Sequence, residues 1–247
     1  VVNLVRCCYY APHSVPLLHR IHMARSTKSK SRRPAGTTSE ARPASARQVR
    51  IIAGEFRGRR LTFPDLPGLR PTADRVRETL FNWLQADVVA EHCLDLFAGS
   101  GACGFECLSR GASTVTFVDR SSEVCRYLQT GLRQLLEGQS DHQPSAQIHN
   151  VSAQDFLQRN ADQSSPYGLV FLDPPFADDC LLEISQQLET GGLLKEKALI
   201  YVESGSSIPL VSQLAPLSNW QVLKEKKAGA VRFALFQRLA TGTSDSA

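Results

Sequence analysis

The sequence predicts an α/β fold in which a mostly parallel sheet of seven strands is covered by helices on both faces. Beyond residue 90, short β-prone apolar runs alternate with segments whose apolar residues recur at helical spacing, and this alternation is typical of parallel sheets. Two strand-like runs around Ala228-Gly229 predict a C-terminal antiparallel hairpin at one sheet edge. The expected strands are 93–97, 114–118, 146–150, 168–172 and 198–202, and the expected helices between them are 102–110, 121–136, 152–160 and 179–189.

Different segments precede this alternation. Residues 24–48 are rich in Ser, Thr, Arg, Pro and Ala and lack an apolar period, which predicts disorder. Because Met23 is the only methionine, we expect residues 1–22 to be an over-extended reading frame rather than native sequence. A β-hairpin rich in arginine and an amphipathic helix over 72–86 are expected next. The predicted organisation is a basic leader (1–48), an N-terminal hairpin (49–67), an α/β domain (68–240) and a disordered tail (241–247).

The charge of the chain is unevenly distributed. Residues 24–60 contain eleven Lys and Arg against two acidic residues, a net charge of +9, whereas the chain from residue 61 onward has 15 basic and 22 acidic residues, a net charge of −7. A basic arm is attracted to polyanions such as RNA, because each neutralised phosphate releases counterions. A solvated tail without a partner explains the same charges equally well.

Cysteine content and hydropathy argue against several classes of protein. The seven cysteines include no C-x-x-C pair, so we expect neither a zinc site nor a disulfide framework, and thiols inside apolar runs suit a reducing cytoplasm. No run reaches the ~18 apolar residues that span a bilayer, and the first residues form no convincing signal peptide. The sequence therefore predicts a cytoplasmic protein with no membrane segment and no metal.

A glycine-rich turn follows the first strand of the alternation. Residues 99–104 match the G-x-G-x-x-G pattern of nucleotide-binding turns, and Asp119 ends the next strand, where an acid accepts hydrogen bonds from ribose. Dehydrogenases and methyltransferases both use this arrangement. Asp95 separates them, because a carboxylate beside the turn would repel a pyrophosphate but attracts the sulfonium and ammonium groups of S-adenosylmethionine.

The most informative tetrapeptide, Asp173-Pro174-Pro175-Phe176, follows the fourth strand. The carboxylate of Asp173 and the carbonyl of Pro174 are two acceptors that can hold the hydrogens of an exocyclic amine and direct its lone pair toward a methyl group. The prolines fix φ and thus place these acceptors before a substrate arrives. Phe176 is expected to stack on a base swung out of its helix. Asp155 is suited to bind an adenine amino group, but a helix N-terminal acid is an equally good interpretation.

Four blocks together resemble the RsmD family of 16S ribosomal RNA guanine-N2 methyltransferases. The resemblance runs from about Val49 to Arg238 and implies a Rossmann-like class I methyltransferase that uses S-adenosylmethionine. It further implies that the substrate is 16S rRNA within a small-subunit particle, that the hairpin contacts RNA, and that a segment including Thr72 covers the pocket. Cys103 and Cys107 depart from the aliphatic residues usual in the family. The blocks are GLRPTADRVRETLFNWL (68–84), LDLFAGSGACGFECLSRGA (94–112), FLDPPF (171–176) and ALIYVES (198–204).

Together these arguments define three groups of candidate residues in a chain expected to be a monomer. The predicted catalytic residues are Asp173, Pro174 and Phe176. The predicted cofactor-binding residues are Thr72, Asp95, Phe97, Gly99, Gly101, Asp119 and Asp155. The predicted RNA-binding residues are Arg57, Arg59, Arg60, Arg70 and Arg75.

Two other functions stay open at this point. An adenine-N6 methyltransferase acting on DNA or RNA would use the same acid-Pro-Pro-aromatic loop, and the residues alone do not separate guanine from adenine. A non-catalytic RNA-binding module would need only the basic leader. Cytosine-C5 methylation is excluded, because it requires a cysteine after a proline and none of the seven is so placed.

Overall fold

The computed structural model describes residues 47–63, 65, 66, 69, 72–137, 145–161, 166–175, 180–205 and 207–240. The predicted leader lies outside these ranges except for its last two residues, and the predicted tail lies wholly outside them. The strands are β1 (Arg47–Arg50), β2 (Arg60–Phe63), β3 (His92–Asp95), β4 (Thr114–Asp119), β5 (Ser145–Asn150), β6 (Tyr167–Leu172), β7 (Leu194–Ser204), β8 (Trp220–Ala228) and β9 (Val231–Arg238). The helices are α1 (Asp74–Leu84), η1 (Gln85–Val88), α2 (Ala102–Ser109), α3 (Ser122–Leu136), α4 (Ala153–Arg159), α5 (Leu181–Thr190) and α6 (Leu210–Gln213).

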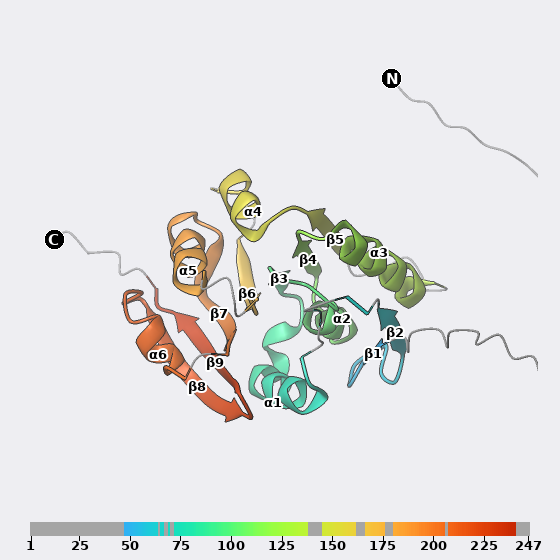
Figure 1. Cartoon of the computed structure of the whole chain (residues 1–247), viewed down its shortest axis with the longest axis horizontal. Helices are drawn as coiled ribbons and strands as arrows, with labels where there is room; N and C mark the ends of the chain where they lie inside the picture. Colours follow the sequence, from blue (N-terminus) through green and yellow to red (C-terminus); the bar gives the residue numbers. More distant parts are fainter. Residues whose placement is uncertain are drawn as a thin grey trace, which may run out of the picture. The chain divides into compact units, whose positions relative to one another are not determined.

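Seven strands form one sheet in the order β5-β4-β3-β6-β7-β9-β8 (Figure 1). β3 pairs in parallel with β4 on one side and with β6 on the other, and β7 continues in parallel from β6. β9 runs antiparallel to both β7 and β8, which confirms the predicted C-terminal hairpin. The strand order reverses between β3 and β6, and in open α/β sheets ligands bind outside the carboxyl ends of the strands at this switch point.

Helices cover both faces of the sheet, as predicted. α1, α2 and α3 bury their apolar side chains in one core cluster with the residues of that sheet face, and α4, α5 and α6 contribute to a second cluster on the other face. Figure 1 shows α4, α5 and α6 on one side of the strands and α1, α2 and α3 on the other. The site described below lies on the face covered by α1, α2 and α3. Side chains at the carboxyl ends of β3, β6 and β7 project from this face.

The N-terminal hairpin is antiparallel, and its register pairs Arg47 with Phe63 and Arg50 with Arg60. Residues 51–59 connect the two strands and fold back toward α2, where Glu55 N–H donates to the carbonyl of Ser109 at 2.7 Å. The apolar side chains of the hairpin belong to the same core cluster as α1, α2 and α3. This burial anchors the hairpin on the α1 face of the sheet.

The structure departs from the predicted elements in their bounds and in two short helices. α1 begins at Asp74 rather than residue 72, and the last predicted helical residues form the 3-10 helix η1. β7 is longer than predicted, since it pairs with Tyr167 before a register shift and with Leu169 after it. α6 was not predicted, because four residues are too short for a periodic pattern. No helix within the described residues is long and apolar enough to cross a membrane.

Candidate active site

A pocket opens at the carboxyl edge of the sheet, beside the switch point between β3 and β6. It encloses about 380 Å³, including space open to solvent. Its walls come from the end of β3 and the loop into α2, and from the ends of β6 and β7. Thr72, which lies two residues before α1, completes the wall. The lining residues are Thr72, Asp95, Phe97, Ala98, Gly99, Ser100, Ala102, Cys103, Phe171, Asp173 and Tyr201.

Asp95 ends β3 at the base of this pocket. Its side chain is 5% exposed, and its Oδ2 accepts a hydrogen bond from Gly104 N–H in the first turn of α2 at 3.0 Å. The pKa of the Asp95 carboxyl is raised to about 7, mainly by burial and also by the negative charge of Asp119, while the hydrogen bond from Gly104 N–H opposes the shift. A buried carboxyl of this kind ionises most readily when a cation binds beside it.

The glycine-rich turn has the backbone shape that only glycine adopts without strain. Gly99 has a φ of +49° and Gly101, the N-cap of α2, has a φ of +70°. A Cβ on Gly101 would lie 2.5 Å from the ring of Phe105, so the turn also requires the absence of a side chain. Asp119 holds the turn in place, because its Oδ2 accepts from Gly99 N–H at 2.9 Å while its Oδ1 accepts from Ser121 N–H at 2.8 Å.

Asp173 follows β6 on the same side of the sheet as Asp95. Its side chain is half-buried at the pocket wall, and Pro174 behind it is buried. Burial raises the pKa of the Asp173 carboxyl well above its usual range, and the negative charges of Glu203 and Asp95 raise it further. The pocket therefore holds its acids with raised proton affinity. Phe176, the third predicted catalytic residue, lies outside the described residues.

Sequence reasoning missed Glu203, a third acid of this cluster. Glu203 lies near the end of β7, is 5% exposed, and accepts a hydrogen bond from the hydroxyl of Tyr201 at 2.6 Å. Burial raises the pKa of the Glu203 carboxyl, while hydrogen bonds from Tyr201 and Thr72 lower it. Its only signal in the sequence is its position at the end of a buried strand, within a block quoted for the family resemblance.

The remaining predicted cofactor residues fall into two groups. Thr72 and Phe97 line the pocket together with Asp95 and Gly99. Gly101, Asp119 and Asp155 do not line it: Gly101 and Asp119 shape the turn, and Asp155 lies exposed in the first turn of α4. There its carboxylate accepts from the hydroxyl of Ser152 at 2.7 Å while Ser152 caps the helix, which is the arrangement of a helix N-terminal acid.

The predicted RNA-binding arginines differ in whether their side chains bind other parts of the chain or are exposed. Arg59 donates to the carbonyl of Leu135 at 2.6 Å and stacks over the ring of Phe56, so it fastens the hairpin to α3. Arg60 donates to the Gln48 side-chain oxygen at 3.5 Å. Arg57 and Arg75 are exposed on the hairpin turn and on α1. Arg70 lies outside the described residues.

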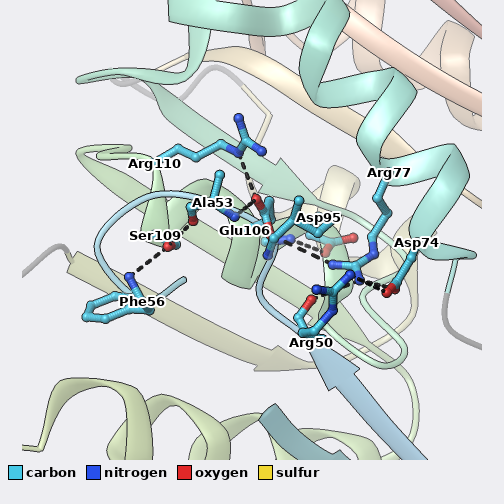
Figure 2. Close-up of polar contacts among 11 residues, drawn as sticks. Arg50, Ala53, Phe56, Asp74, Arg77, Asp95, Glu106, Ser109 and Arg110 are labelled. Carbon is cyan, nitrogen blue, oxygen red and sulfur yellow. Dashed lines mark hydrogen bonds and ion pairs between the residues drawn. The ribbon is translucent and has the colours of Figure 1, made fainter. Parts of the chain in front are cut away.

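A buried ion pair joins α1 to α2, the helix that follows the glycine turn (Figure 2). Arg77 of α1 is 1% exposed and lies 3.8 Å from the fully buried carboxylate of Glu106 in α2. The same carboxylate accepts from the N–H groups of Ile52 and Ala53 at 2.7 and 3.0 Å. Since Gly104 on this helix also holds Asp95, the network connects the hairpin to the floor of the pocket.

The charge of the pocket indicates the kind of ligand that fits. Among the described residues that line it there is no Lys, Arg or His, whereas Asp95 and Asp173 line it and Glu203 lies beside Tyr201. A pyrophosphate would face uncompensated negative charge here. The sulfonium and ammonium groups of S-adenosylmethionine suit these residues, so the structure supports the predicted distinction from dinucleotide enzymes. The described residues also contain no group of His, Cys, Asp and Glu arranged to hold a metal ion.

Comparison with known proteins agrees with this fold. Residues 49–237 match the family described as "Conserved hypothetical protein 95". The chain is 46% identical over 201 residues to ribosomal RNA small subunit methyltransferase D of Escherichia coli K12, with 81% of this chain and 94% of that protein covered.

Solved structures with a similar fold include methyltransferases. A putative methyltransferase from Escherichia coli superposes with a TM-score of 0.66 at 43% identity, covering 78% of this chain and 99% of that one. A 16S rRNA N2 methyltransferase of Thermus thermophilus, solved with AdoMet and guanosine, superposes with a TM-score of 0.57 at 21% identity, covering 78% of this chain and 50% of that one, and this likeness concerns the fold. The matched region and its identity to these relatives establish that the chain belongs to the conserved hypothetical protein 95 family, the RsmD family of methyltransferases.

Proposed function

We propose that the chain transfers a methyl group from S-adenosylmethionine to the exocyclic N2 amine of a guanine in 16S ribosomal RNA, within a small-subunit particle in the cytoplasm. The observation that carries the proposal is the position of Asp173, which follows β6 and lines the same pocket as Asp95, with Pro174 next to it in the chain. The name of the Escherichia coli relative supports ribosomal RNA as the substrate.

The cofactor supplies an electrophilic methyl group on a positively charged sulfur. Asp95 provides the negative charge that stabilises the bound cofactor in a pocket without basic lining residues. The turn at Gly99 lets the backbone approach the ligand closely, and Asp119 fixes the shape of that turn through Gly99 N–H. We assign adenosine recognition to Phe97 and to the segment at Thr72, both of which line the pocket.

The acceptor amine is activated by orientation rather than by prior deprotonation. Asp173 and the Pro174 carbonyl accept its two hydrogens, so its lone pair faces the methyl group, and holding both partners in line supplies much of the acceleration. The nitrogen–carbon bond forms as the sulfur–carbon bond breaks, and the amine then releases one proton. The raised pKa of Asp173 suits it to take that proton.

The choice of guanine rests on the family resemblance, because an adenine N6 amine offers the same two hydrogens. RNA attraction is assigned to the exposed arginines Arg57 and Arg75 and to the basic leader, which lies outside the described residues except for Arg47 and Gln48. Charge on that leader would steer the chain to ribosomal RNA in a salt-dependent manner.

The decisive experiment incubates the full chain with isotope-labelled S-adenosylmethionine and small-subunit particles from a strain that lacks the gene. The modified nucleotide is then mapped by mass spectrometry. We expect label on N2 of one guanine; label on an adenine N6 would overturn the base assignment, and particles without label would overturn the activity. Asp173→Asn should abolish transfer while cofactor binding by calorimetry persists, and the exposed Asp87→Asn on η1 serves as the matched control.

A further inference from the structure

The C-terminal hairpin places two exposed lysines on the same face of the sheet as the pocket. Tyr201 of β7 lies opposite Leu235 of β9, which in turn lies opposite Lys224 of β8. Residues directly opposite one another on neighbouring strands project from the same face. Leu235 and Tyr201 belong to the core cluster beneath α1, so Lys224 emerges on that face at the outer edge of the sheet.

A second row repeats this arrangement closer to the carboxyl edge. Glu203 lies opposite Phe233, and Phe233 lies opposite Lys226. Each lysine is thus two strands away from a residue of the pocket or its acid cluster, about 10 Å at the usual strand spacing of about 4.8 Å. The pocket residue Tyr201 and the two lysines therefore lie within the span of a few nucleotides.

An aromatic contact orients the surface between the lysines and α1. Trp83 stacks on Phe233 with ring centroids 5.4 Å apart, and the ammonium of Lys226 lies 5.8 Å from the centre of the Trp83 ring. On α1, Arg75 lies eight residues before Trp83, about 12 Å along the helix axis. Arg75 is exposed and adds a third cation to this surface.

Two details distinguish these cations from those that stabilise the fold. Of the other basic residues of this hairpin, Arg238 pairs with Glu189 at 2.7 Å and Arg232 lies 4.0 Å from Glu225. Lys227 lies opposite Arg232 and projects with it from the other face of the sheet. For Lys224, Lys226 and Arg75, by contrast, the described part of the chain shows no ion pair. Along α1, Asp74 directly precedes Arg75 but its carboxylate pairs with Arg50 and Arg77, and Glu78 lies one turn further on. The surface of Lys224, Lys226 and Arg75 thus keeps its positive charge available to a partner.

We propose that Lys224 and Lys226, with Arg75, bind phosphates of the RNA strand that flank the target nucleotide. The inference rests on the proposed function, because a base that enters the pocket brings its neighbouring phosphates to the rim while the pocket itself offers no cation. α1 lies between the two hairpins (Figure 1) and contacts this one through Trp83 and the N-terminal one through Arg77. Lysines on an edge strand also discourage aggregation, and that role needs no RNA.

The test compares the full chain with Lys224→Gln, Lys226→Gln and the double variant. Binding to small-subunit particles is measured over a series of KCl concentrations. Each lost phosphate contact should lower the slope of log affinity against log salt by about 0.7 to 0.9. The KM for particles should rise while kcat at saturation and calorimetric binding of S-adenosylmethionine stay unchanged. Lys197→Gln is the matched control, because Lys197 is exposed near the amino end of β7, away from the pocket.

The outcomes separate this inference from the proposed function. Should the double variant match wild type and Lys197→Gln in slope and affinity, the hairpin does not bind RNA, even if wild type methylates guanine. Should wild type methylate no RNA while the double variant still weakens particle binding with a smaller salt slope, the surface stands and the proposed activity falls. Wild type that fails to bind the particles at all would overturn the surface as well.

Discussion

Two glycines in the N-terminal hairpin offer a controlled test of how the hairpin is fastened to α2. Gly54 has a φ of +82° and Gly58 a φ of +84°, both in the connection between β1 and β2. A Cβ on Gly54 would lie 1.8 Å from the carbonyl oxygen of Ser109 and 2.4 Å from its carbon, whereas a Cβ on Gly58 would meet nothing within 4 Å. The two positions share a backbone strain and differ in the space around them.

The expected magnitudes follow from this difference. Alanine at either position costs about 1 to 2 kcal/mol, because L-residues disfavour positive φ. Gly54→Ala must also push the turn away from Ser109, which strains or breaks three hydrogen bonds: Glu55 N–H to its carbonyl at 2.7 Å, Phe56 N–H to its hydroxyl at 2.9 Å, and its hydroxyl to the Ala53 carbonyl at 2.5 Å. At a net 0.5 to 1.5 kcal/mol for each bond, the additional loss is about 1.5 to 4.5 kcal/mol.

Equilibrium urea unfolding followed by tryptophan fluorescence measures both variants, since Trp83 and Trp220 lie in the folded core. We expect Gly54→Ala to lower the free energy of unfolding well beyond Gly58→Ala, with similar m-values. Equal destabilisation of the two variants would refute the reasoning, because it would mean that the Ser109 contact does not hold the turn.

Three further predictions concern the buried charges. In the absence of the cofactor, the pKa of Asp95 is about 7 in the folded chain against 3.8 in the unfolded chain. The protonated carboxyl therefore favours folding, and this contribution to the free energy of unfolding is lost as the pH rises from about 4 through 7. Urea titrations at each pH should show that Asp95→Asn loses less stability over that interval than wild type. Glu203→Gln removes a negative charge that raises the pKa of Asp173. The acid limb of the pH–rate profile should therefore move to lower pH. A uniform drop in rate at every pH would contradict this role of Glu203. Arg77→Met removes the buried guanidinium 3.8 Å from the Glu106 carboxylate, which keeps Arg110 at 2.8 Å. It also leaves the Arg50 carbonyl without this donor, so we expect a loss of about 1 to 3 kcal/mol of stability, with Arg77→Met/Glu106→Gln closer to wild type. Strict additivity in that double-mutant cycle would argue against the pair.

The sequence predicted the parallel sheet and the meeting of its acids at one edge for one physical reason. In a parallel sheet the carboxyl ends of the strands share an edge, so acids that follow separate strands in the sequence are brought together in space. Asp95 and Asp173 are 78 positions apart in the chain, yet both line one pocket. The glycine pattern at residues 99–104 likewise predicted the turn, because local backbone geometry alone requires glycine there.

The contacts of individual side chains could not be predicted from the sequence. Arg59 and Arg57 look alike in an arginine-rich hairpin, but only packing against α3 gives Arg59 a carbonyl partner and leaves Arg57 exposed. Arg77 lies on an amphipathic helix among exposed acids and arginines, and it is buried only because the hairpin covers that part of α1. Such roles depend on which surfaces meet, and local residue patterns do not encode that.

Residue types and their spacing therefore determined on their own that this chain forms a mostly parallel α/β sheet with an acidic, glycine-rich switch point. Tertiary structure alone decided that Glu203 lies beside Tyr201 in the acid cluster, that the Asp119 carboxylate accepts from Gly99 N–H, and that Lys224 and Lys226 project from the pocket face of the sheet. The physical reason is that strand periodicity is a local property, whereas burial and charge compensation arise only when distant segments of the chain pack together.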